Sequence, residues 1–129
     1  MKLRIRGNAL RLRLQRQEVQ GLVETGKVVE ATCFGDENFV YTLESDDHTT
    51  AIRAELEARS IRIRVPENQV MIWAKSDEIS LYGEQPTSTG PLKILIEKDL
   101  ACIKPRTSAQ WEDESDAFPN PNPSCGGNS

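Results

Sequence analysis

The chain has 129 residues, of which 37% are hydrophobic and 28% are charged, and its formal net charge is −4. This length fits one ordinary domain with a modest core, and the composition excludes a collagen-like or fully disordered chain. No apolar run approaches the ~20 residues of a membrane-spanning helix, so the sequence predicts no such helix and no membrane partner. None of these figures identifies an activity.

The beginning of the chain predicts a β-hairpin. Apolar and cationic residues alternate on both sides of a Gly-Asn pair at residues 7–8, and a period of two is typical of strands. A two-residue turn at this pair places Leu3 opposite Leu12 on the apolar face. The same register places Arg4 opposite Arg11, so like charges face each other on the other side.

A short helix is expected over residues 16–25, with Gly26 able to end it, and two further hairpins are expected after it. The first of these hairpins is predicted to gather Val29, Ala31, Cys33, Phe39, Tyr41 and Leu43 on one face. In the second, strict alternation over residues 51–59 outweighs the helix propensity of its Ala, Glu and Leu. Its predicted register places Glu55 opposite Arg62 and Arg53 opposite Arg64.

The remaining pattern predicts a helix from Pro66 to about Lys75, then strands at 79–83 and 92–97. The element order is therefore ββ-α-ββ-ββ-α-ββ. It predicts an α+β fold with two short helices on a mostly antiparallel, curved sheet or barrel of about eight strands. Residues 1–106 are expected to form one domain, followed by an acidic tail rich in Pro and Asn at 107–129. No internal repeat is evident beyond the recurring hairpin.

The cysteines and the single histidine disfavour metal chemistry. Cys33, Cys102 and Cys125 are odd in number and far apart, and they form no C-x-x-C pair, so neither a disulfide framework nor a zinc site is expected. No apolar segment of a secretory signal follows the first cations. These observations predict a cytoplasmic protein with free thiols, no metal and no cofactor.

The main candidate site is a set of arginines opposite the apolar faces of two hairpins: Arg4, Arg6, Arg11, Arg13, Arg62 and Arg64. A guanidinium group binds phosphate and carboxylate with bidentate geometry, so one sheet carrying all six would be an anion-binding surface or a basic tunnel. The plainer interpretation is a solvated face whose arginines pair with nearby glutamates. Candidates for that pairing are Glu44, Glu55, Glu57 and Glu97.

The tail is the second candidate. Its aromatic Trp111 and Phe118 stand among four carboxylates, including Asp116, and alternating prolines follow. Proline at every second position favours an extended backbone that loses little entropy on binding. The tail is predicted either to be a solubilising end, to dock on a partner, or to fold back onto the arginines. Its charge of −4 contrasts with the +6 of residues 1–16.

Four segments of the chain carry a resemblance to a known family. They are K-L-R-I-R-G-N-A-L-R-L-R-L at the start, W-A-K-S-D-E, E-K-D-L-A-C-I-K-P-R, and E-D-E-S-D-A-F-P-N-P near the end. Together they resemble a family of small bacterial proteins of unknown function, about 120–130 residues long. The resemblance implies no activity, cofactor or site. Where that family has Ser or Thr, this chain has Ala9 and Gln15, and Gln15 is a weaker helix cap.

Three functional hypotheses remain open. The leading one is a non-enzymatic binding or accessory domain whose arginine face takes an anionic small molecule, an anionic protein or its own tail. The second is an enzyme acting on a phosphorylated or polyphosphate substrate inside a basic barrel. The third is a structural module that dimerises through its edge strands. The acidic total charge and the few spare aromatics disfavour nucleic acid as a partner.

Overall fold

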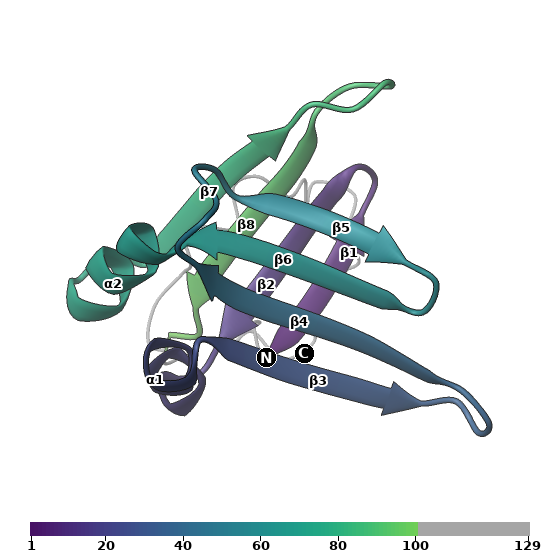
Figure 1. Ribbon diagram of the computed structural model, residues 1–129, viewed down its shortest axis with the longest axis horizontal. Helices are drawn as coiled ribbons and strands as arrows, with labels where there is room; N and C mark the ends of the chain where they lie inside the picture. The colour runs from purple at the N-terminus through teal and green to yellow at the C-terminus, as the bar shows by residue number, and fades with distance from the viewer. Residues whose placement is uncertain (101–129) are drawn as a thin grey trace, which may run out of the picture. The chain divides into compact units, whose positions relative to one another are not determined.

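A computed structural model describes residues 1–100 of the chain. It contains eight strands and two helices in the predicted order, which confirms the α+β class (Figure 1). The elements are β1 (Lys2–Arg6), β2 (Ala9–Leu14), α1 (Arg16–Thr25), β3 (Lys27–Cys33), β4 (Asn38–Asp46), β5 (Arg53–Glu57), β6 (Ser60–Pro66), α2 (Glu67–Lys75), β7 (Ser80–Gln85) and β8 (Leu92–Lys98). The predicted domain boundary at residue 106 lies outside the described residues. Neither helix is long and apolar enough to span a bilayer.

The strands form two four-stranded sheets. Sheet A has the order β1-β2-β8-β7, and sheet B has the order β3-β4-β6-β5. Each of the four hairpins is antiparallel, whereas the central pairs β2–β8 and β4–β6 are parallel. The prediction of a single curved sheet or barrel is therefore wrong. After β2 and after β6 a helix carries the chain to the other sheet, so neighbouring hairpins in sequence are split between two sheets.

The fold repeats itself within the chain. The segments β1-β2-α1-β3-β4 and β5-β6-α2-β7-β8 have the same topology, and each sheet takes the first hairpin of one half and the second hairpin of the other. In the first hairpin and the helix of each half, residues 51 positions apart take matching places, as Leu12 in β2 and Ile63 in β6 do. In the second hairpins the matching residues are 53 positions apart, as Thr42 in β4 and Leu95 in β8 are. The expectation of no repeat beyond the hairpin form is thus corrected by the strand order.

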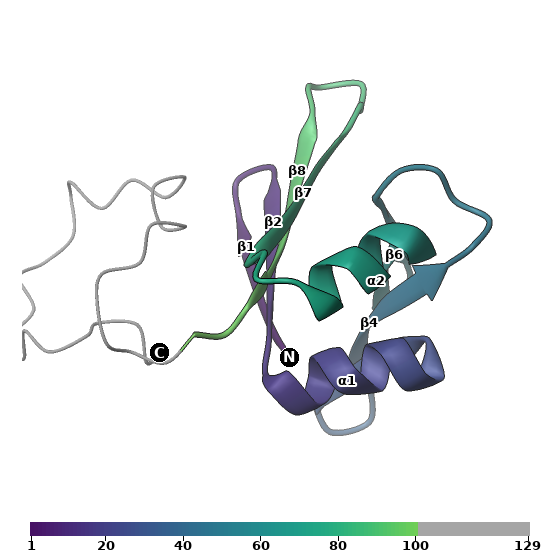
Figure 2. The same ribbon diagram turned by 90° about the vertical axis from the view of Figure 1, so that its left-hand side faces the viewer.

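The core lies between the two sheets and beneath the helices. Both helices and sheet B lie on one side of sheet A, and the helices lie beside each other (Figure 2). Trp73 on α2 is fully buried and its indole N–H donates to the Ile79 carbonyl at 2.9 Å. Leu22 fills the matching place on α1 and is also buried. Each helix therefore contributes one large side chain to the shared core.

Two of the predicted registers are confirmed. Leu3 pairs with Leu12 across a turn in which Gly7 has a φ of 54°, and Glu55 pairs with Arg62. Helix α1 covers its predicted residues; the N–H of Gln15 donates to the Glu18 carboxylate at 2.9 Å, which caps the helix without Ser or Thr.

The predicted apolar face of the β3–β4 hairpin is wrong by one residue. Val28, not Val29, pairs with Leu43 on the core side, and Glu30 pairs with Tyr41. The alternation of Val29, Ala31 and Cys33 was misleading, because the charged Glu30 lies on the inner side of the strand. Its carboxylate contacts the amino group of Met1 there at 3.0 Å. A carboxylate that has a cationic partner can occupy a position that the pattern reserves for an apolar side chain.

Side chains bridge the two corners where the sheets approach each other. At one corner, the Gln85 side chain accepts from the Ala54 N–H at 2.7 Å and donates to its carbonyl at 3.1 Å. A Cβ atom on the neighbouring Gly83 would lie 2.9 Å from the Cβ of Ile52. At the other corner, the Met1 amino group contacts Glu30 and Glu18. These contacts fix the sheets against each other although they share no backbone ladder among the described strands.

Candidate functional site: two arginine-bearing sheet faces

The candidate arginines lie on the outward faces of the sheets, away from the core. We call the outward face of sheet A face A; it comprises Lys2, Arg4, Arg6, Ala9, Arg11, Arg13, Ser80, Tyr82, Glu84, Lys93, Leu95 and Glu97. The outward face of sheet B is face B; it comprises Lys27, Val29, Ala31, Cys33, Asn38, Val40, Thr42, Glu44, Asp46, Arg53, Glu55, Glu57, Ser60, Arg62 and Arg64.

The structure separates the six predicted arginines into two groups. Four of them, from β1 and β2, lie on face A, and the pair from β6 lies on face B. The two arginine-bearing hairpins are therefore not neighbours in one sheet. They occupy equivalent places in the two halves of the repeat. The prediction that each arginine lies opposite the apolar face is confirmed, but the possibility that all six share one surface is wrong.

Two guanidinium groups share one carboxylate at the centre of face A. One oxygen of Glu97, Oε1, accepts from Nε of Arg11 and from Nε of Arg13, each at 3.0 Å. The Nη2 atoms of the same arginines lie 2.8 and 2.9 Å from that oxygen. Among these three residues the formal charge is +1. Arg11 is 4% exposed and Glu97 is 1% exposed, so this is a buried ion cluster.

The pKa directions on face A follow from this packing. Burial lowers the pKa of Arg11, against the opposing effect of the Glu97 charge, but an arginine stays protonated at any physiological pH. The hydroxyl of Tyr82 donates to Glu84 at 2.6 Å, and this bond is the main reason that the Tyr82 pKa is raised. Tyr82 and the 8%-exposed Leu95 pair across β7 and β8 and add apolar surface beside the arginines.

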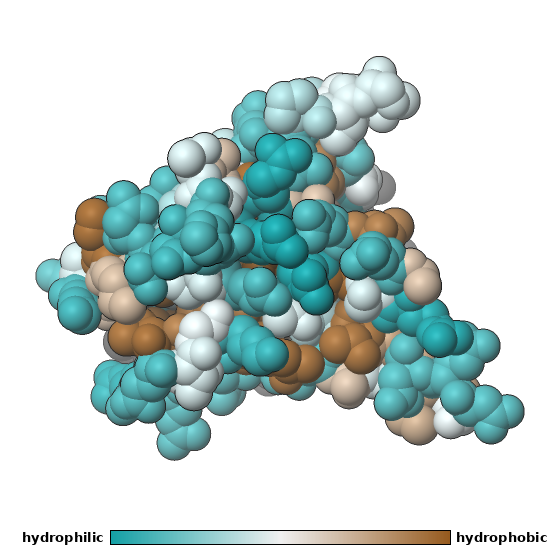
Figure 3. Space-filling view, in the orientation of Figure 1, coloured by the Kyte–Doolittle hydropathy of each residue, from teal (hydrophilic) through white to brown (hydrophobic). Residues whose placement is uncertain are grey.

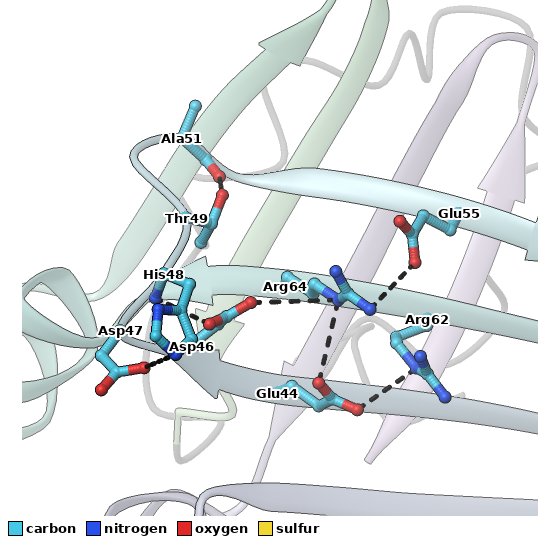
Figure 4. Close-up of polar contacts among 9 residues, drawn as sticks. All are labelled: Glu44, Asp46, Asp47, His48, Thr49, Ala51, Glu55, Arg62 and Arg64. Atoms are coloured by element: carbon cyan, nitrogen blue, oxygen red, sulfur yellow. Dashed lines mark hydrogen bonds and ion pairs between the residues drawn. The ribbon is translucent and has the colours of Figure 1, made fainter.

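Face B carries the matching cluster in an exposed form. Glu44 takes the place of Glu97, and its carboxylate lies 3.2 Å from Nε of Arg62 and 3.9 Å from Nε of Arg64. Figure 4 shows Arg64 between three carboxylates, since Asp46 at 4.0 Å and Glu55 at 3.5 Å also approach it. The Arg62 side chain is 45% exposed, so these pairs are screened by water.

The formal charges of the two faces differ. Face A has six cationic and two anionic residues, a net charge of +4, whereas face B has four of each sign. Figure 3 views face B, where hydrophilic residues cover the middle of the sheet. Of the glutamates predicted as partners, three form ion pairs with the candidate arginines: Glu44, Glu55 and Glu97. The formal charges of face B therefore cancel within its own strands, whereas the strands of face A keep a formal net charge of +4.

The other candidate residues give no second site. Trp111, Asp116 and Phe118 lie outside the described residues. His48 lies in an exposed turn, where its backbone N–H donates to Asp46 Oδ1 at 2.8 Å. Within residues 1–100, no group of three or more His, Cys, Asp or Glu side chains gathers as a metal site would require. The absence of a cofactor stays a prediction.

An open groove lies at the far tips of sheet B. It is lined by residues of the β3–β4 loop and the β5–β6 turn, among them Phe34, Glu37 and Arg59. Arg59 is paired with Glu37 at 3.2 Å, and both side chains are about two-thirds exposed. The groove contains none of the six candidate arginines, so it is not the basic pocket that an enzyme of the second hypothesis needs.

Sequence reasoning missed the importance of three residues on face A. Glu97 was one of four possible partners, and Leu95 and Tyr82 were only members of predicted strands. Their position became evident only from the parallel pairing of β2 with β8, which places Glu97 beside Arg13 and Leu95 beside Arg11. A comparison of the chain with itself at an offset of 51 residues would have revealed the matching Arg-x-Arg segments of β2 and β6.

Comparison with known proteins places the chain in one family. Residues 1–122 match the model of DUF7009, described as a family of unknown function. A search of curated proteins and a search of solved structures returned no match. The match covers most of the chain and confirms the resemblance to a family of unknown function that the four sequence segments indicated. The chain therefore belongs to DUF7009, a family of unknown function.

Proposed function

We propose that the protein is a non-enzymatic binding domain whose face A binds an acidic polypeptide segment. The observation that carries this proposal is the net charge of +4 on one sheet face, set around the apolar pair Tyr82 and Leu95. Positive potential attracts and orients an acidic partner, and the apolar pair offers contact area that charge alone does not supply. Face B has the same strand topology and a net charge of zero, so it provides an internal reference.

The spread of the cations favours an extended polypeptide over a small anion. They extend from Arg4 and Arg6 on the edge strand β1, through β2, to Lys93 on β8. Adjacent strands are about 4.8 Å apart, so these charges match carboxylates spaced along a chain better than one phosphate group. Guanidinium groups bind carboxylates through paired hydrogen bonds.

Nucleic acid fits face A less well. The aromatic residue of this face, Tyr82, is hydrogen-bonded to Glu84, and a carboxylate next to a stacking surface repels phosphates. Glu97 adds a second negative charge in the middle of the face. An acidic peptide meets the same charges, but its uncharged side chains can lie over Tyr82.

The barrel-enzyme hypothesis loses its geometric basis. It required arginines and carboxylates converging in one closed, concave interior, whereas the strands form two separate sheets. Arg4 and Arg11 point outward from one sheet, and Arg62 points outward from the other. Dimerisation through an edge strand remains a prediction, and light scattering of the samples described below measures it.

The test is binding of labelled poly-L-glutamate, about 20 residues long, followed by fluorescence anisotropy. The full chain is used, together with a variant whose tail carboxylates are neutralised so that they do not compete: E112Q/D113N/E114Q/D116N. We expect poly-L-glutamate to bind at least to this variant, with an affinity that falls as the salt concentration rises. Adding R4Q/R6Q to that variant should lower the affinity about tenfold, because two exposed cations leave face A.

The matched control is R53Q/R62Q on face B, which removes the same charge from the same fold and should change the affinity less than about twofold. Absence of binding in both chains, or an equal loss from both arginine pairs, would contradict the proposal. A labelled DNA strand of similar charge that binds more tightly than poly-L-glutamate would replace it with nucleic-acid binding.

A further inference from the structure

We propose that copies of this chain associate through the edges of their sheets, with β1 of one copy lying antiparallel to β5 of another. The partner is thus a second copy of the same chain, and the contact joins sheet A of one copy to sheet B of the next. This goes beyond the proposed function, which concerns the outward side chains of face A. Three properties of the two strands support it: the direction of their backbone groups, their exposed apolar side chains and their charges.

The edge strands turn backbone groups outward at equivalent places. Among the described strands, β1 and β5 each have a single neighbour (Figure 1). In an antiparallel pair, every second residue points its N–H and C=O away from the partner strand. On β5, Ala54 is such a residue, since its N–H and C=O bond to the Gln85 side chain, and Leu56 is therefore the next one. Ile5 holds the matching place on β1, 51 residues earlier.

The same two residues expose large apolar side chains. Ile5 is 57% exposed and Leu56 is 74% exposed, although their cross-strand neighbours Leu10 and Ile61 are buried. An apolar side chain beside outward backbone groups is a template for a further strand, because a strand added there covers the side chain and bonds the backbone together. Each edge therefore offers both kinds of contact at one residue.

The backbone directions fix the register between the copies. Two residues that both point their N–H and C=O across the gap exchange two hydrogen bonds, so Ile5 of one copy lies opposite Leu56 of the other. Counting outward from this pair, the antiparallel register brings opposite charges together on both sides: Arg4 opposite Glu57, and Arg6 opposite Glu55. Opposite charges at facing positions stabilise a strand pair, and all four side chains lie on the outward faces.

The same charges disfavour the pairing of like edges. Two β1 strands paired in this way place Arg4 opposite Arg6 twice, and two β5 strands place Glu55 opposite Glu57 twice. Like charges at facing positions destabilise a strand pair. Charged side chains thus protect each edge against its own copy, while β1 and β5 complement each other. The contact is heterologous, so it either closes between copies or continues along a row.

The test is sedimentation velocity of the full chain over a range of protein concentrations. We expect a mass above that of the monomer that rises with concentration and falls as salt screens the charge pairs. Ile5→Pro and Leu56→Pro each remove an N–H that faces outward, a change that an edge strand tolerates. Each should weaken self-association about tenfold or more, because the contact loses a hydrogen bond and gains a steric clash.

Mixing the two proline variants should restore association as a one-to-one complex, because the intact β5 of the first meets the intact β1 of the second. Val29→Pro is the matched control. Val29 is a half-exposed residue of the edge strand β3, and its N–H also faces outward by the alternation of that hairpin. This variant should change self-association less than about twofold.

The other outcomes overturn the inference. A full chain that stays monomeric at all concentrations has no such contact. Association that survives in Leu56→Pro alone indicates pairing of two β1 strands, and association that survives in Ile5→Pro alone indicates pairing of two β5 strands. A mixture of the proline variants that stays monomeric contradicts the heterologous contact. Neither proline variant changes the charge of face A, so poly-L-glutamate binding tests the proposed function separately.

A charge exchange tests the register without proline. Arg4→Glu alone and Glu57→Arg alone each place like charges opposite each other in the contact, so each should weaken self-association about fivefold or more. Their mixture places opposite charges together again and should recover the association. Glu78→Arg, which makes the same charge change in an exposed segment after α2, should have less than about a twofold effect. A mixture that associates no better than its components would overturn the register.

Discussion

The two sheets of this protein are built to the same plan but present different outward faces. Both have an Arg-x-Arg pair on one central strand and a glutamate on its parallel neighbour: Arg11, Arg13 and Glu97 in sheet A, and Arg62, Arg64 and Glu44 in sheet B. The difference lies mainly in the edge strands. Where β1 has Arg4 and Arg6, β5 has Glu55 and Glu57.

This difference shows that two sheets of the same topology can balance their outward charges in different ways. On face B, carboxylates of the two strands beside β6 surround the arginines, so the like-charge pair Arg53 and Arg64 is tolerated without an outside ligand. On face A, two pairs of cations, Lys2–Arg13 and Arg4–Arg11, face each other between β1 and β2, and Glu97 lies between Arg11 and Arg13. The result is one face whose formal charges cancel and one face with a formal net charge of +4.

The largest expected difference between the faces is the effect of removing the shared glutamate. Glu97→Gln should lower the free energy of unfolding by about 3 kcal/mol, because two buried guanidinium groups lose their common carboxylate. The matched Glu44→Gln should lower it by less than about 1 kcal/mol, since that cluster is exposed. Urea denaturation of both variants measures this. Equal losses would mean that the two clusters are energetically equivalent.

The corner between the sheets should be nearly as sensitive. Gly83→Ala would bring a methyl group to 2.9 Å from Ile52 Cβ, inside the contact distance, and should cost about 1–3 kcal/mol. Gly21→Ala is the control, because nothing lies within 4 Å of its added Cβ on α1, and it should stabilise the protein by about 0.5–1 kcal/mol through helix propensity. Thermal unfolding distinguishes the two. If Gly83→Ala leaves the stability unchanged, the sheets can move apart freely at this corner.

Exchanging the edge-strand charges should exchange the properties of the faces. In the tail-neutralised chain, R4E/R6E gives face A the pattern of face B and should reduce poly-L-glutamate binding more than tenfold, about 1.4 kcal/mol or above. E55R/E57R makes the reverse change on face B and should create a second binding site there. Titration by calorimetry gives the stoichiometry. A second site that fails to form would show that charge alone does not define the surface.

The smallest predicted effect concerns the corner at Met1. Burial alone would raise the pKa of Glu18, but the amino group of Met1 lowers it; the pKa of that amino group is in turn raised, because Glu18 and Glu30 outweigh its own burial. The Glu18 contribution to stability is lost as pH falls through its lowered pKa, and the amine contribution is lost as pH rises through its raised pKa. Both are present between about pH 5 and 8.

Glu18→Gln keeps an acceptor for the helix cap at Gln15 but removes the charge. In that pH window it should therefore lower the free energy of unfolding by less than about 1 kcal/mol, and the difference from the unsubstituted chain should shrink at either end. Urea denaturation at a series of pH values measures this. A difference that is constant across the series would show that packing, not charge, holds the corner.

The local parts of the fold were predictable from the sequence and the distant ones were not. Alternation fixed the registers of β1–β2 and β5–β6, because one residue of slip would mix apolar and cationic faces. The parallel pairs β2–β8 and β4–β6 join strands that are far apart in the chain, and no local pattern specifies them. The register of β3 was missed because a partnered Glu30 stands among apolar residues.

The candidate site was predicted in its parts but not in its arrangement. Each of the six arginines lies on an outward face, as the alternation predicted, and Glu44 and Glu97 pair with them as the plainer interpretation held. Their separation into two faces depends on the strand order, which the sequence alone left open. The net charge of −4 likewise concealed a face of +4, because the charges that oppose it lie on other surfaces and in the tail.

The most direct test is to find which surface a bound acidic chain touches. Poly-L-glutamate is added to the ¹⁵N-labelled tail-neutralised chain, and the amide signals of the two faces are followed by NMR. If face A is the binding surface, the signals of Arg4, Arg11 and Leu95 on face A will move and those of Thr42 and Arg62 on face B will not. Movement on face B alone, or equal movement on both faces, would contradict it.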